Sequence, residues 1–97
     1  IFDNFGRAPL YQDSKDWENL LAVMQEQPAP FMWWNHYMGT ASHHLGKKDN
    51  AKKYFARVKE LLGGVNTIEA LKKEAEIWHE MTVIEEMMPV YLEYGLD

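Results

Sequence analysis

The apolar residues of this chain recur every three or four positions, which is the spacing of one face of an α-helix. Trp17, Leu20, Leu21 and Met24 form the first of these stripes, and proline or glycine follows where the stripes end. The sequence contains no alternating run of β-branched residues bounded by hairpin turns. The pattern therefore predicts an all-α fold.

Turn-forming residues divide these stripes into four to five antiparallel helices within a single domain, residues 1–97. Pro28 and Pro30 interrupt any continuous helix, so residues 28–30 are expected to form a turn. The expected segments are an irregular N-terminal arm over 1–12, repeat-like helices over 15–27, 30–46 and 50–62 within the region 13–62, and a long C-terminal helix over 67–94 that Pro89 kinks or stops.

Charge is distributed along the chain in three blocks. Residues 1–46 carry a net charge of −3, residues 47–73 carry +5 and residues 74–97 carry −7, which gives −5 in total. A negative chain is not expected to bind nucleic acid non-specifically. Two explanations of the basic block remain open: its helix lies beside an acidic helix, or it forms a phosphate or anion site.

Several functional classes find little support in the sequence. The apolar runs are a few residues long, whereas a membrane span needs about 20, so no membrane span is expected. No cysteine is present to act as a nucleophile or zinc ligand, and Ser14 and Ser42 lack the sequence context of a catalytic serine. Gly63-Gly64 lacks the spacing of a phosphate-binding loop. We therefore expect neither an enzyme nor a bound cofactor.

Two glutamates fall within the apolar arc of the expected C-terminal helix. A buried carboxylate at Glu74 or Glu85 would have a raised pKa and could act as a general acid or base. Pairing with a lysine from a neighbouring helix, Lys52, Lys53 or Lys59, is the structural alternative.

The expected helices on either side of Gly46 carry small and aromatic residues at complementary positions. Small residues at Gly39 and Ala51 let two helix axes approach, and Phe55 is placed to fill the space between them. With the Met38-Gly39 pair followed by the Ala51-x3-Phe55 spacing, residues 31–63 resemble a tetratricopeptide repeat, a helix-turn-helix of 34 residues. The preceding helix then resembles the second half of an earlier repeat.

The resemblance implies a helical-hairpin fold and a binding groove for a protein partner. The tryptophan, tyrosine and proline positions of the repeat hold Asn35, Ser42 and Gly63 here, so the motif is degenerate. In proteins of that family the first helix of each pair lines the groove. The residues at the corresponding positions are Trp33, His36, Thr40 and His43.

The same helix also carries a stripe of aromatic and polar residues beside its core stripe. Large amphipathic aromatics are typical of the centre of a protein interface. We therefore predict that the chain is an accessory or scaffold subunit of a larger assembly, with Trp33 at the centre of its contact surface. Packing of these side chains on a neighbouring helix is the other explanation. The predicted partner-binding residues are Trp33, His36, Tyr37, Thr40, His43 and His44.

A metal- or cofactor-binding bundle is the alternative function, because the chain has four histidines. His36 and His43 share a helix face but lie roughly 10.5 Å apart at the usual helical rise, and His44 points away from His43. Glu76 and His79 form a single E-x-x-H motif, whereas di-iron bundles carry two. No residue is therefore assigned as a metal ligand.

Overall fold

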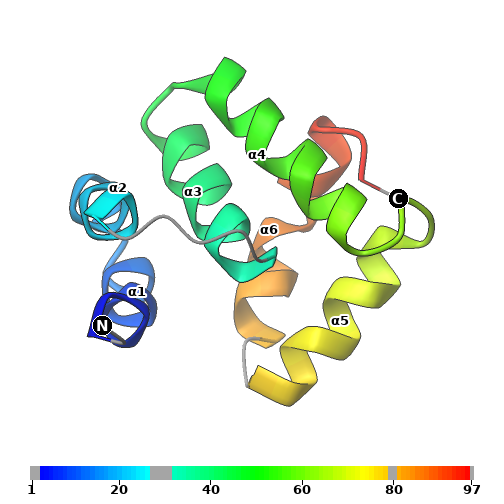
Figure 1. The fold of residues 1–97 in the computed structure, drawn as a ribbon, viewed down its shortest axis with the longest axis horizontal. Helices are drawn as coiled ribbons and strands as arrows, with labels where there is room; N and C mark the ends of the chain where they lie inside the picture. The colour runs from blue at the N-terminus through cyan, green and yellow to red at the C-terminus, as the bar shows by residue number, and fades with distance from the viewer. Residues whose placement is uncertain (1–2, 27–31, 79–80, 97) are drawn as a thin grey trace.

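The structure, a computed structural model, describes residues 3–26, 32–78 and 81–96. These residues form helices and turns, and no β-strand occurs among them. The predicted all-α fold is confirmed, with six helices in the described ranges in place of four to five. The helices are α1 (Asp3–Asp13), α2 (Trp17–Glu26), α3 (Met32–His44), α4 (Lys48–Leu61), α5 (Thr67–Trp78) and α6 (Met81–Glu93) (Figure 1).

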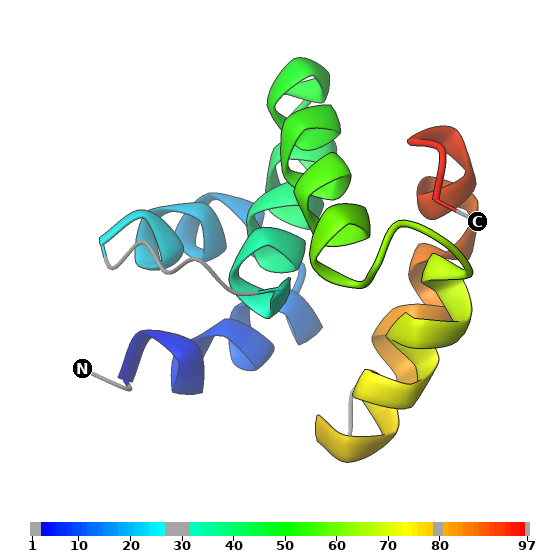
Figure 2. The ribbon, with the colours of Figure 1, turned by 45° about the vertical axis from the view of Figure 1, so that its right-hand side comes forward.

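The helices form three successive hairpins. Helix α1 packs against α2, α3 against α4, and α5 against α6, while α2 also packs against α3. The α3–α4 hairpin occupies the middle of the molecule, with α1 and α2 on one side and α5 and α6 on the other (Figures 1 and 2). The predicted antiparallel hairpin arrangement is therefore present.

The central hairpin is close-packed because one position on α3 has no side chain. A methyl group at Gly39 would lie 3.0 Å from Cζ of Phe55 and 3.1 Å from its Cε1 and Cε2. Phe55 itself is completely buried. The ring of Phe55 thus occupies the space that a side chain at position 39 would need, as the sequence predicts.

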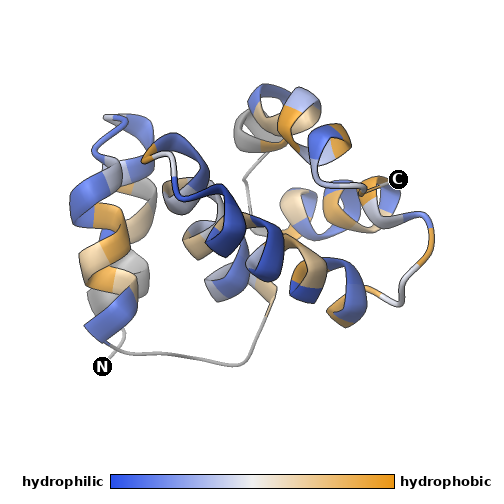
Figure 3. Ribbon diagram, turned by 90° about the horizontal axis from the view of Figure 1, so that it is seen from above, coloured by the Kyte–Doolittle hydropathy of each residue, from blue (hydrophilic) through white to orange (hydrophobic). Residues whose placement is uncertain are grey.

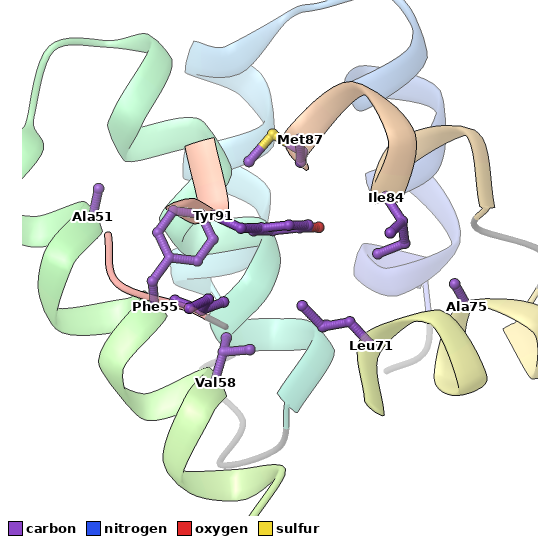
Figure 4. Packing of buried hydrophobic residues seen from close by; sticks show 9 residues of the cluster. Ala51, Phe55, Val58, Leu71, Ala75, Ile84, Met87 and Tyr91 are labelled. Atoms are coloured by element: carbon purple, nitrogen blue, oxygen red, sulfur yellow. The ribbon is translucent and has the colours of Figure 1, made fainter. Parts of the chain in front are cut away.

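Two groups of buried residues form the core. Trp33 packs against both groups and links them. The first group joins α1, α2 and α3 through Ala8, Leu20, Leu21, Val23, Met24, Tyr37, Met38 and Ala41. The second joins α4, α5, α6 and the C-terminal turn through Ala51, Phe55, Val58, Leu71, Ala75, Ile84, Met87, Tyr91 and Leu96 (Figure 4).

The expectation of an irregular arm over residues 1–12 is wrong, because residues 3–13 form α1. Ala8 is completely buried against the α2 side of the core, so the helix is held by packing although its composition is polar. The next helix begins at Trp17 rather than at 15. Asp16 caps it, since its carboxylate accepts hydrogen bonds from the backbone N–H and the side-chain amide of Asn19 at 3.4 and 2.7 Å.

The expectation of one long helix over 67–94 is also wrong, since α5 ends at Trp78 and α6 begins at Met81. Folding back lets Leu71 on α5 and Ile84 on α6 enter the same core, which one straight helix could not achieve (Figure 4). Pro89 lies inside α6 and does not end the helix, which continues to Glu93. Because Pro89 is exposed, its ring meets solvent.

Hydrophobic and hydrophilic residues alternate along each helix, as expected for helices with one buried face (Figure 3). Among the described residues, no helix combines the length and apolar character that crossing a membrane requires. The expected turn at 28–30 lies outside the described residues.

We predict that Gly39→Ala lowers the free energy of unfolding by about 1–3 kcal/mol, because the added methyl group pushes Phe55 out of its position. Helix propensity alone predicts the opposite sign, a gain of roughly 0.5–1 kcal/mol. Urea unfolding followed by circular dichroism measures the difference. A stabilised variant would contradict the close contact, and Phe55→Leu in the same chain should recover part of the loss.

Candidate functional site

Three of the predicted partner-binding residues lie inside the protein. His36 and Thr40 are no more than 1% exposed and Tyr37 is 5% exposed. The prediction that these residues belong to an open surface is therefore wrong. The reason is that α3 lies between α2, α4 and α6, so that nearly its whole circumference is covered.

His36 pairs with a tyrosine from the far end of the chain. Its Nε2 lies 2.5 Å from the hydroxyl oxygen of Tyr91 on α6, and its Nδ1 has no hydrogen-bond partner among the described residues. Burial lowers the pKa of His36 to about 3 and raises the pKa of Tyr91. Both side chains are therefore neutral at physiological pH, and the pair joins α3 to α6.

Trp33, the predicted centre of the contact surface, bridges the two core groups. It is half-buried, and its indole Nε1 is buried without a hydrogen-bond partner among the described residues. Its ring lies 5.1 Å from that of His36 in an edge-to-face arrangement. This position gives Trp33 a packing role, and a partner contact through it remains a prediction.

The last two predicted residues lie at the exposed end of α3. The Nδ1 atom of His43 is 2.9 Å from the hydroxyl oxygen of Tyr94, which forms a second histidine–tyrosine link. The ring of His44 stacks on Trp17, with centroids 4.0 Å apart and planes 8° from parallel. Partial burial, together with the charges of His43 and Lys15, lowers the pKa of His44. His44 is therefore uncharged at neutral pH.

The Trp17–His44 pair forms part of a cleft of about 490 Å³. Helix α1 and the turn after it, helix α2, the C-terminal half of α3, and α6 all contribute side chains. The cleft therefore draws on all three hairpins, and its size falls in the usual range for ligand-binding clefts. The lining residues are Gln12, Lys15, Trp17, Thr40, His44, Glu86, Met87 and Val90.

The buried part of the cleft lining contains hydrogen-bond acceptors. Gln12 is 7% exposed, and its Oε1 finds no hydrogen-bond partner in the part of the chain that the structure describes. Thr40 uses its hydroxyl proton to bond the backbone carbonyl of His36 at 2.9 Å, which leaves the lone pairs of its oxygen. A buried acceptor without a donor is unusual in folded proteins, so Gln12 marks a place where a donor is missing.

Two charged residues stand in this lining, one of each sign. Lys15 is exposed in the α1–α2 turn, where its backbone takes a left-handed conformation with φ of 59°. Glu86 is exposed on α6. Neither forms an ion pair with a described residue, so both are free to meet a ligand.

Sequence reasoning found two of the lining residues, Thr40 and His44, and missed the rest. Gln12 fell in the segment expected to be irregular, and Trp17 was placed in the core stripe of its own helix. Glu86 is remote from both in sequence, and its position depends on how α6 packs. No local signal in the sequence joins these segments, because the cleft is a product of hairpin packing.

The basic and acidic blocks of the sequence are joined by an ion pair between two helices. The ion pair between Lys48 and Glu93, at 3.3 Å, links the basic α4 to the acidic α6, as the first of the two explanations predicts. A second recess of about 440 Å³ beside α4 contains Lys53 and Arg57, and Arg57 is paired with Glu60. This pairing reduces the positive charge available for an anion there.

The metal and acid–base alternatives receive no specific support from the described residues. No three histidine, aspartate or glutamate side chains in the described ranges are grouped as a metal site, and His79 lies outside those ranges. Glu85 is exposed and Glu74 is half-buried. Neither forms an ion pair with Lys52 or Lys53 in the described part of the chain.

Comparisons with protein-family models, with curated proteins and with solved structures give no match to this chain. The described part of the chain is a helical protein of three hairpins with a cleft between them. Its function must be inferred from the residues of that cleft.

We predict that acidification destabilises the fold through His36. The unfolded chain binds a proton near the ordinary pKa of 6.5, whereas the folded chain does so near 3. The contribution of His36 is therefore complete above pH 6.5 and falls by about 1.4 kcal/mol per pH unit below it. Urea unfolding at several values between about pH 7 and pH 5 measures this slope.

Variants separate His36 from the other histidines in this prediction. His36→Gln, which cannot titrate, should remove most of the slope, whereas the double variant His43→Gln/His44→Gln should retain most of it. An unchanged slope in His36→Gln would mean that another group controls the acid sensitivity.

Proposed function

We propose that this chain is a protein–protein interaction module, an accessory or scaffold subunit of a larger assembly, which holds a segment of its partner in the cleft beside Trp17 and His44. The observation that carries the proposal is the aromatic stack in a cleft whose lining also contains Gln12, with its buried Oε1 left without a hydrogen-bond partner among the described residues. A cleft whose lining combines apolar side chains with an unsatisfied buried acceptor is suited to a ligand that brings its own hydrogen-bond donor.

The composition of the cleft supports a protein partner. The stacked tryptophan and histidine, together with Met87 and Val90, give a mixed aromatic and aliphatic lining, which also contains the charged residues Lys15 and Glu86. Interfaces have this arrangement, with apolar anchors surrounded by a polar rim. Three hairpins supply the walls, so a partner segment would contact several helices at once.

The resemblance of residues 31–63 to a tetratricopeptide repeat is compatible with this function. Proteins of that family bind partners along the first helices of their hairpins, and two residues of α3, Thr40 and His44, line the cleft. The close contact of Gly39 with Phe55 agrees with the packing for which the repeat selects small and aromatic residues. The proposal assigns no catalytic residue and no cofactor.

The alternative function, a metal- or cofactor-binding bundle, has less to support it. His36 and His43 are engaged with Tyr91 and Tyr94, and His44 is stacked on an indole. No observation on these histidines specifically favours a metal, so the interaction function is preferred.

The test is native mass spectrometry of the chain recovered gently from its natural source, tagged and expressed at its natural level. We expect a mass that includes a second polypeptide. Trp17→Ala and His44→Ala should each reduce the fraction of bound chain several-fold, because each removes one half of the aromatic stack.

Leu10→Ala is the matched control. Leu10 is 68% exposed on α1 and does not line the cleft, so its removal should leave the complex intact. Thermal unfolding of every variant confirms that the fold is retained. A bare chain, or a complex that both stack variants retain in full, would contradict the proposed role of the cleft, and a chain with an added metal or cofactor mass would favour the alternative.

A further inference from the structure

The acceptor character of the cleft limits what it can bind. Two oxygens in its buried lining, Oε1 of Gln12 and Oγ1 of Thr40, can receive hydrogen bonds, and the first has no donor among the described residues. With the Gln12 amide in its observed orientation, a carboxylate or phosphate at this position would place oxygen against oxygen. A group rich in N–H donors would satisfy both acceptors.

The charge on the α6 side of the cleft has the same preference. Glu86 lines the cleft and has no ion-pair partner among the described residues, and α6 carries Glu85, Glu86 and Glu93 and no basic residue, with Glu93 paired to Lys48. Lys15 is the opposing charge, but it is exposed in a turn, where its long side chain can move toward solvent. The field along α6 therefore attracts cations.

The aromatic wall selects among cationic groups. Trp17 and His44 stack nearly parallel, and His44 is exposed. Because His44 is uncharged at neutral pH, it does not repel a cation. A guanidinium group is planar, packs on aromatic faces and carries five N–H donors, whereas an ammonium group is a compact point charge that is strongly hydrated. The wall therefore favours arginine over lysine.

We propose, resting on the interaction function above, that the partner presents a basic segment and that an arginine side chain from it enters the cleft. Its guanidinium packs beside the Trp17–His44 pair and donates to Gln12 and Thr40, and its charge is balanced by Glu86. A cleft of about 490 Å³ has room for this side chain and part of the adjoining backbone.

The experiment is an NMR titration of the full chain, with a capped pentapeptide that has arginine at its centre and glycine elsewhere as the probe. We expect saturable shifts of the Trp17 indole, the Gln12 side-chain amide and the Thr40 methyl signals. A lysine-centred peptide should bind at least about fivefold more weakly, and a glutamate-centred peptide should produce no saturable shift.

Variants assign the binding to the proposed groups. Glu86→Gln and Gln12→Leu should each weaken the arginine peptide at least about fivefold, and Lys15→Gln should strengthen it. Glu85→Gln is the matched control, because Glu85 is an exposed neighbour on the same helix and does not line the cleft. It should weaken binding much less than Glu86→Gln does.

Three results would overturn this inference. These are tighter binding of the glutamate peptide than of the arginine peptide, equal effects of Glu85→Gln and Glu86→Gln, and no saturable shift with any peptide. If the natural complex still depends on Trp17 in any of these cases, the interaction function stands and only the arginine chemistry is wrong. If that dependence on Trp17 is also absent, both proposals fail.

Discussion

The contact between Gly39 and Phe55 determines how the three hairpins can be assembled. Since position 39 carries no side chain, the ring of Phe55 can lie directly against the backbone of α3. The same ring also packs against Tyr91 of α6 and Tyr94 just after it, with centroids 6.1 and 5.2 Å away. One aromatic residue on α4 thus connects the central hairpin with the last one, and α6 reaches its place beside the cleft through this contact.

A polar pair accompanies this aromatic contact. His36 lies edge-to-face with both Phe55 and Tyr91 and also pairs with the tyrosine hydroxyl. Aromatic packing alone tolerates small slides of one helix along another, whereas a hydrogen bond between two buried groups specifies one register. The second link, between His43 and Tyr94, lies two helical turns further along α3 and constrains the same alignment.

Much of the fold can be predicted from local sequence, and the reasons for the failures are physical. Helical spacing identifies α2 to α4, and the left-handed backbone at Gly46, with φ of 79°, ends α3 as expected. No proline or glycine immediately precedes the break between α5 and α6 in the sequence. The apolar faces of both helices instead pack into one core group, which a single straight helix could not do. Conversely, Pro89 lies inside α6 with its ring exposed, although an interior proline usually ends or kinks a helix.

The site was harder to predict than the fold. Polar residues such as His36 and Thr40 indicate an open surface when only their own helix is considered, yet neighbouring helices cover them. Burial of this kind depends on contacts between residues far apart in the chain, which a periodic pattern does not contain. His44 belongs to the predicted stripe of Trp33, Tyr37 and Thr40, and it is exposed because it is the last residue of α3.

The separation of 55 positions between His36 and Tyr91 has a consequence for the order of biosynthesis. A ribosome completes the first two hairpins well before it reaches α6. Helix α3 therefore lacks its contact with α6 while the chain is still growing. During that interval the imidazole of His36 is open to water, and the cleft lacks its α6 wall. A chain that ends before α6 therefore cannot form the finished cleft, because it lacks Glu86, Met87 and Val90.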